Sequence, residues 1–136
     1  MTTNNSSAIS DRIEAIEAAY EFMLAYAAQG RDGTEEGSGS EIRQFLTELD
    51  DALEGIGSVA IAGFTNELMS TAVTEPFINV VSEDASKTQS TVKMVLALQS
   101  ISSQVVDNLN ASIHVRALLT DLFLLDEIFK TEVGAK

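Results

Sequence analysis

Four polar side chains in the last third of the chain have types and a spacing suited to chemistry. They are Asp107, Asn110, His114 and Asp121, which follow one another at steps of three, four and seven residues. If the helices that carry them are continuous, this spacing places all four on one side. Together, carboxyl, amide and imidazole groups offer several hydrogen-bond donors and acceptors, so this stripe is the candidate polar pocket. The alternative is that His114 and Asp121 are partly solvated at the edge of an apolar face.

Asp121 is expected to need a partner for its charge. It falls within the apolar arc of the last predicted helix, and a buried carboxylate is costly unless it is paired. We therefore expect it to meet a partner on another helix or on a second copy of the chain, or to lie at an open cleft.

Several familiar chemical motifs are missing from the sequence. The chain has no Cys, and its one His lacks the Glu-x-x-His spacing of di-iron helical bundles. The glycine-rich segment 30–39 has no Lys after its last glycine, as a phosphate-binding loop requires, and no Gly-x-Ser-x-Gly motif occurs. We predict no metal ion and no cofactor, leave catalytic residues unassigned, and favour a protein that is not an enzyme.

Apolar residues at helical spacing predict the elements that must position these groups. Steps that alternate between four and three residues predict a first helix that begins near Ser10 and ends at Gly30. Residues 1–8 hold no apolar cluster, so we expect a disordered tail there. The glycine-rich segment 30–39 is expected to form a flexible loop.

The second predicted helix contains an interruption. Ser38 and Glu41 fit a capping box at its start. Gly55 and Gly57 then predict a break or kink, although the sequence leaves open whether the helix is continuous there.

The second half of the chain is predicted to be mostly helical. Helical spacing after the glycines is expected to end at Pro76, and residues 76–83 fit either a helix or an extended segment. A long helix is expected from Ala85, and a final helix from about Asn110 to Glu132. The sequence leaves open whether these two are continuous. The apolar stripe of the long helix consists of Met94, Leu98, Ile101, Val105 and Leu109.

Taken together, these elements predict an all-α protein that folds as an antiparallel helical bundle of four to five helices. The predicted organisation is the tail at 1–8 followed by one helical-bundle domain at 9–133. A chain of 136 residues is long enough to bury a core without disulfides or a metal ion.

The last predicted helix is apolar around most of its circumference. One explanation is that it lies at the centre of the bundle; the other is that part of its surface is an interface, since a small bundle rarely encloses a helix fully. The candidate interface residues are Leu118, Leu119, Leu122, Phe123, Leu125 and Phe129. On this basis we predict a homodimer.

The charge of the chain limits its partners. A net charge of −13 repels phosphate backbones, so we expect no nucleic-acid binding. Residues 1–75 hold 14 acidic and 3 basic side chains, whereas residues 76–136 hold 7 and 5. The strongly acidic first half predicts attraction to a basic protein partner.

The sequence also favours a cytoplasmic location. Its polar start lacks the basic and apolar regions of a signal peptide. The longest apolar segment, residues 117–129, is shorter than the ~20 residues of a membrane span. We therefore expect no membrane-spanning helix.

These observations support one leading hypothesis and two alternatives. The leading hypothesis is a non-enzymatic cytoplasmic interaction protein, either an accessory subunit, an adaptor or a chaperone, that forms a homodimer. The first alternative is a ligand-binding or catalytic bundle with a polar pocket near His114 and Asp121. The second is a bundle that opens to bind an apolar surface such as a storage granule.

Overall fold

The computed structural model describes residues 5–34, 38–63 and 71–132, and these residues contain six helices. They are α1 (Asn5–Ala27), α2 (Ser38–Leu53), α3 (Ile56–Gly63), α4 (Thr71–Leu96), α5 (Ser103–Ala111) and α6 (Ile113–Glu132). These residues contain no strand, and the expected all-α bundle is confirmed.

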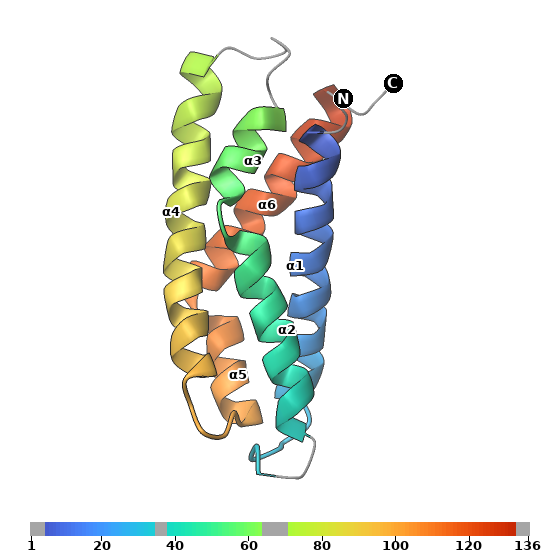
Figure 1. The fold of residues 1–136 in the computed structure, drawn as a ribbon, viewed down its shortest axis with the longest axis vertical. Coiled ribbons are helices and arrows are strands. Elements are labelled where there is room, and N and C mark those ends of the chain that lie inside the picture. The colour runs from blue at the N-terminus through green and yellow to red at the C-terminus, as the bar shows by residue number, and fades with distance from the viewer. Residues whose placement is uncertain (1–4, 35–37, 64–70, 133–136) are drawn as a thin grey trace.

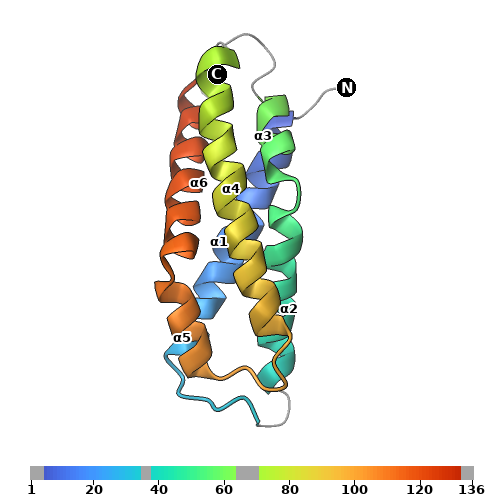
Figure 2. The same ribbon diagram turned by 90° about the vertical axis from the view of Figure 1, so that its left-hand side faces the viewer.

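The six helices take the places of four in an antiparallel bundle (Figure 1). α1 runs in one direction, α2 and α3 return, α4 runs back, and α5 and α6 return again (Figures 1 and 2). α1 packs on α2, α3 and α5, whereas α4 packs on α2, α3 and α6. Each of the pairs α2–α3 and α5–α6 therefore replaces one long helix of a four-helix bundle.

α1 carries the apolar stripe that the sequence predicts. Ile9, Ile13, Ile16 and Met23 are all almost completely buried. The helix already begins at Asn5, inside the segment 1–8 where we expect a tail, because the first turn leads directly into the buried Ile9. Residues 1–4 of that segment, and residues 133–136 at the other end, lie outside the described residues.

The break expected near Gly55 is present. α2 ends at Leu53 and α3 begins at Ile56. Gly55 has a φ of 67°, in the left-handed region that glycine tolerates best. The Arg12 guanidinium of α1 donates hydrogen bonds to the carbonyls of Ala52 and Glu54, which satisfies two acceptors at the end of α2.

The expectation that Pro76 ends a helix is wrong. α4 begins at Thr71 and continues through Pro76, so residues 76–83 are helical. Pro76 lies only five residues from the start of the helix, where its missing N–H removes one hydrogen bond, to the carbonyl of Ala72. Burial of Ile78 and other side chains farther along α4 favours the continuous helix. The preceding segment, residues 64–70, lies outside the described residues.

The prediction of one long helix from Ala85 is also wrong beyond Leu96. α4 ends there, and the chain turns through residues 97–102 before α5 begins. Met94, assigned by its spacing to the core stripe, is 69% exposed, whereas Ile101 is completely buried within the turn. The buried positions of α4 are Thr74, Ile78, Val81, Ala85, Thr88, Val92 and Val95.

Polar contacts at both sides of this turn explain why the helix stops. The hydroxyl of Ser102 caps α5 by accepting a hydrogen bond from the N–H of Val105 at 3.1 Å. The guanidinium of Arg43, from α2, donates to three carbonyls at the end of α4. These are the carbonyls of Leu96, Leu98 and Gln99.

The end of α1 interlocks with the start of α5, and we call this contact the α1–α5 junction. The hydroxyl of Tyr26 donates to the carbonyl of Ile101 at 2.6 Å, and the hydroxyl of Ser103 donates to the carbonyl of Tyr26 at 2.6 Å. The backbone N–H of Arg31 donates to the Ser103 hydroxyl, and the Ser103 N–H donates to the Arg31 carbonyl, both at 2.8 Å.

α5 and α6 are separate helices. Ser112 lies between them with a ψ of 134°, which is outside the helical region. Its hydroxyl accepts a hydrogen bond from the N–H of His114 at 3.3 Å and so caps α6. Asn110, where the sequence places the start of the last helix, lies inside α5.

Candidate functional site

The structure gives the four residues of the predicted polar pocket three different surroundings. Asp107 and His114 are exposed, Asn110 is buried, and Asp121 is half-buried. The predicted stripe requires one continuous helix, and the break at Ser112 interrupts it.

Asn110 holds two helices together. Its side-chain Nδ2 donates to the carbonyl of Met23 at 3.2 Å, which ties α5 to α1. Its Oδ1 is buried and forms no hydrogen bond to any described residue. An amide buried between helices with one bond satisfied is a structural contact of the core.

Asp107 lines an open cavity of about 340 Å³ at the end of the bundle. Arg31 and Gln104 line the same cavity, so it contains one cationic and one anionic side chain. The Arg31 guanidinium lies over the ring of Tyr26, 5.7 Å from the ring centroid.

Asp121 meets a partner on another helix, but this partner is a second carboxyl group. Asp84 of α4 forms a side-chain hydrogen bond with it across the seam between α4 and α6. The Oδ2 atom of Asp121 is buried and has no hydrogen bond to any described residue. Burial, the hydrogen bond and the repulsion from Asp84 raise the pKa of Asp121 from 3.8 to about 7. At neutral pH, Asp121 therefore holds a proton in a substantial fraction of molecules.

Most of the candidate interface residues on the last helix lie in the core of the single chain. Leu118, Leu119, Leu122, Leu125 and Phe129 are each at most 7% exposed. Phe123 is the exception, with 48% of its surface exposed. The exposed apolar side chains of α6 are thus largely different from those that the sequence favours.

A group of exposed apolar side chains lies along α4 and α6, which are side by side in Figure 2. We call this surface the α4–α6 face. It consists of Val73, Val80 and Met94 on α4 and Ile113 and Leu124 on α6, with exposed fractions from 47% to 74%. Val80 precedes Asp84 by one turn and Leu124 follows Asp121 by one turn, so both flank the carboxyl pair.

Six exposed or partly exposed positions of α4 recur at a regular spacing that the sequence analysis missed. Phe77, Val80, Asp84, Lys87, Thr91 and Met94 follow one another at alternating steps of three and four residues. We call these six positions the α4 outer stripe. The spacing is visible in the sequence, but assigning Met94 to the core stripe obscured it.

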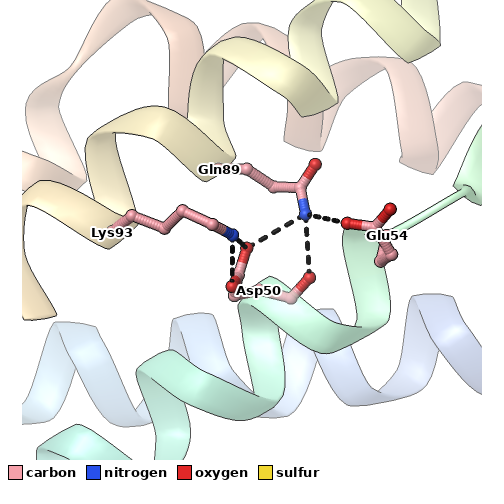
Figure 3. Close-up of polar contacts among 4 residues, drawn as sticks. All are labelled: Asp50, Glu54, Gln89 and Lys93. Atoms are coloured by element: carbon pink, nitrogen blue, oxygen red, sulfur yellow. Dashed lines mark hydrogen bonds and ion pairs between the residues drawn. The ribbon is translucent and has the colours of Figure 1, made fainter.

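The opposite side of α4 is held against α2 by a polar cluster (Figure 3). Lys93 Nζ forms an ion pair with Asp50 Oδ2 at 2.6 Å. The amide of Gln89 donates to Asp50 Oδ1 at 3.0 Å and to Glu54 Oε1 at 3.1 Å. This cluster fixes α4 against α2 and leaves the α4 outer stripe free of these contacts.

A shallow groove between α1 and α2 has acidic walls. It has a volume of about 360 Å³, and three of its lining residues are Asp11, Glu48 and Asp51. The remaining lining residues are Arg12, Ala15 and Ala52. Because the Arg12 guanidinium caps the end of α2, the groove presents mainly negative charge.

Neither a metal-binding cluster nor a membrane-spanning helix occurs in the described part of the chain. No group of three or more His, Cys, Asp or Glu side chains suited to a metal ion occurs among them. None of the described helices is long and apolar enough to cross a membrane.

Comparison with known proteins gives no relative of this chain. No family model matches it, and neither a curated protein nor a solved structure shows significant similarity.

Proposed function

We propose that this chain is a non-enzymatic interaction protein of the cytoplasm that forms a homodimer through its α4–α6 face. In the dimer, the acidic surface of α1 and α2 stays free to bind a basic segment of another protein. The observation that carries the proposal is the concentration of exposed apolar side chains on α4 and α6.

The distribution of exposed apolar residues supports self-association at this face. Of the eight large apolar side chains that are exposed among the described residues, five form the α4–α6 face. The other three, Leu24 on α1, Ile61 on α3 and Phe123 on α6, lie outside it. Burying apolar surface at a contact contributes about 25 cal/mol per Å², so the α4–α6 face has the most to gain.

The distribution of charge supports a second copy as the occupant of this face. Residues 1–75 have a net charge of −11, whereas residues 76–136, which include most of α4 and all of α6, have a net charge of −2. Contact through α4 and α6 brings the two nearly neutral halves together. It keeps the two acidic halves apart and so limits their mutual repulsion.

The acidic groove supports a basic partner for the other side of the molecule. Asp11, Glu48 and Asp51 would face lysine or arginine side chains, while Ala15 and Ala52 would contact their aliphatic parts.

The test is the solution mass of the purified protein, measured by light scattering at protein concentrations from about 1 to about 100 μM. This range covers the dissociation constants of moderately tight to weak dimers. We expect a dimer, and we expect Val80→Lys to raise the dissociation constant by about ten-fold or more, because it places a charge in the apolar contact. Leu24→Lys is the matched control, since Leu24 is equally exposed on α1, and it should leave the dimer intact.

Two results would contradict the proposal. The first is a wild-type chain that is still a monomer at about 100 μM, since the dissociation constant of the dimer would then lie above this concentration. The second is a dimer that Val80→Lys and Leu24→Lys weaken equally. A monomer that retains a small molecule in native mass spectrometry would instead favour ligand binding, for which the cavity at Asp107 and Arg31 is the first place to look.

A further inference from the structure

The α4 outer stripe has the spacing of a coiled-coil seam. Alternating steps of three and four residues keep one set of side chains facing a partner helix along the whole contact. The apolar members Phe77, Val80 and Met94 lie toward the two ends, and the two charged members, Asp84 and Lys87, lie next to each other in the middle. Val80 and Met94 are 47% and 69% exposed, and Phe77 is partly buried against the core.

The central charges determine which direction of pairing is possible. If two copies of α4 paired in parallel and in register, Asp84 would face Asp84 and Lys87 would face Lys87. Like charges facing each other across a contact are destabilising. Antiparallel pairing about a midpoint between Ala85 and Ser86 places Asp84 of each copy opposite Lys87 of the other.

The same midpoint pairs every other position of the stripe. Phe77 of one copy faces Met94 of the second, and Val80 of one copy faces Thr91 of the second. A shift of one heptad in either direction would place Asp84 opposite Val80 or Met94, which leaves its charge unpaired. One antiparallel register therefore satisfies both the apolar and the charged positions.

We propose that two copies of this chain associate through antiparallel α4 helices, with reciprocal ion pairs between Asp84 of each copy and Lys87 of the other. This inference rests on the proposed homodimer and specifies its geometry and its specificity-determining residues. The occupant of the α4 outer stripe is a second copy because the stripe is complementary to itself.

The surroundings of the two charged residues are consistent with this pairing. Lys87 is exposed, and the ion pairs formed within the described residues, Lys93–Asp50 and Lys130–Asp126, do not involve it. Asp84 is already fixed in place by its hydrogen bond with Asp121.

A charge exchange tests the ion pairs. Asp84→Lys gives a chain with two lysines at the centre of the stripe, and Lys87→Asp gives a chain with two aspartates. Each variant alone should dimerise at least about ten-fold more weakly than wild type, whereas an equimolar mixture should form a heterodimer. The double variant Asp84→Lys/Lys87→Asp should dimerise like wild type. Arg116→Asp on α6 has the same change of charge as Lys87→Asp outside the stripe and should have little effect.

Cysteine cross-linking tests the register without altering any charge. The natural chain has no Cys, so Val80→Cys and Thr91→Cys each introduce a single thiol. In the antiparallel register, a mixture of the two variants should form a disulfide-linked heterodimer under mild oxidation. Neither variant should cross-link alone, because equivalent positions then lie about 16 Å apart along the helix axis.

The outcomes separate this inference from the proposed homodimer. If the wild-type chain is a monomer, both fail. If it is a dimer but the mixtures form neither a charge-exchanged heterodimer nor a cross-link, only the α4 register is overturned. Cross-linking of Val80→Cys with itself would indicate parallel pairing and would also overturn it. Circular dichroism of each variant checks that it is folded, and the cysteine variants keep the test decisive if Asp84→Lys does not fold.

Discussion

Asp121 is the residue whose environment departs most from that of a surface carboxyl group. The sequence predicts that this residue needs a partner, since it lies within an apolar arc. It could not identify Asp84 as that partner, because rules of charge pairing favour a basic side chain. A proton shared between two carboxyl groups removes the cost of burying a second negative charge, and no cation is needed.

This arrangement predicts a pH dependence of stability. The folded-state pKa of Asp121, about 7, lies above the ordinary value of 3.8. Folding therefore takes up a proton between these two values, so the stabilisation from this group is complete below about pH 4 and is lost as the pH rises through about 7. Asp121→Asn keeps a neutral side chain at every pH. Since the side chain is only half-buried, we expect the variant to be about 1 to 2 kcal/mol more stable than wild type at pH 8, with a much smaller difference at pH 5.

Urea unfolding followed by circular dichroism at the two pH values measures this difference. Asp107→Asn, at an exposed position of α5, is the control and should show no change of this kind between the two pH values. An Asp121→Asn variant whose stability relative to wild type is the same at both pH values would show that the carboxyl pair does not share a proton.

Helix ends account for most of the differences between the predicted and the observed elements. Pro76 is a strong helix-breaking signal, but it lies close enough to the start of α4 to remove only one hydrogen bond. Residues 97–102 look helical by their apolar spacing, whereas the turn depends on Arg43 and Tyr26, which are more than 50 residues away. Local sequence does not contain such distant contacts, so these ends could not be predicted. The break at Gly55 could, because its cause is local.

The loop after α1 offers a test of how closely it packs on the α1–α5 junction. Gly30 and Gly33 both have positive φ values, of 68° and 86°. A Cβ atom on Gly30 would meet no other atom, whereas one on Gly33 would lie 2.6 Å from the carbonyl oxygen of Ile101. We therefore expect Gly30→Ala to cost about 1 kcal/mol from backbone conformation alone, and Gly33→Ala about 2 to 4 kcal/mol.

Thermal unfolding of the two glycine variants beside wild type provides the comparison. Equal losses of stability would mean that the backbone conformation alone matters at these positions, and that the loop does not press against Ile101.

At the scale of the whole molecule, the helical class and the antiparallel bundle could be predicted because apolar periodicity persists over most of the chain. The candidate site could be predicted only in part. The sequence could predict that Asp121 needs a partner, but the spacing that suggested a shared pocket with Asp107 required a continuous helix. The α4 outer stripe was not predicted because Met94 fits the helical spacing of two different stripes, the apolar stripe expected to face the core and the outer stripe.

The uneven charge of the molecule predicts opposite salt effects for its two proposed contacts. Two chains of net charge −13 repel each other, and salt shortens the range of this repulsion to about 10 Å at 0.1 M. We therefore expect the homodimer to become several-fold tighter between low and moderate salt. Binding of a lysine-rich peptide to the acidic groove should become weaker over the same range.

Sedimentation velocity of the protein alone, and fluorescence anisotropy of a labelled peptide, measure the two effects. A homodimer that dissociates as salt is added would mean that the ion pairs at its centre outweigh both the apolar contacts and the repulsion between the two acidic chains.

The α1–α5 junction also determines when the bundle can close. Its hydrogen bonds join residues that are 72 to 77 positions apart in the chain, and the bond from Asn110 to Met23 spans 87. Contacts between such distant parts of a chain slow folding, because a long loop must be closed before they form. During synthesis, α1 leaves the ribosome before α2 and α3 and can pack on them, but its contacts with α5 must wait until α5 has also emerged. The apolar side of α1 that α5 covers is therefore exposed until α5 has been made, and a growing chain is vulnerable to aggregation or capture by chaperones during that interval.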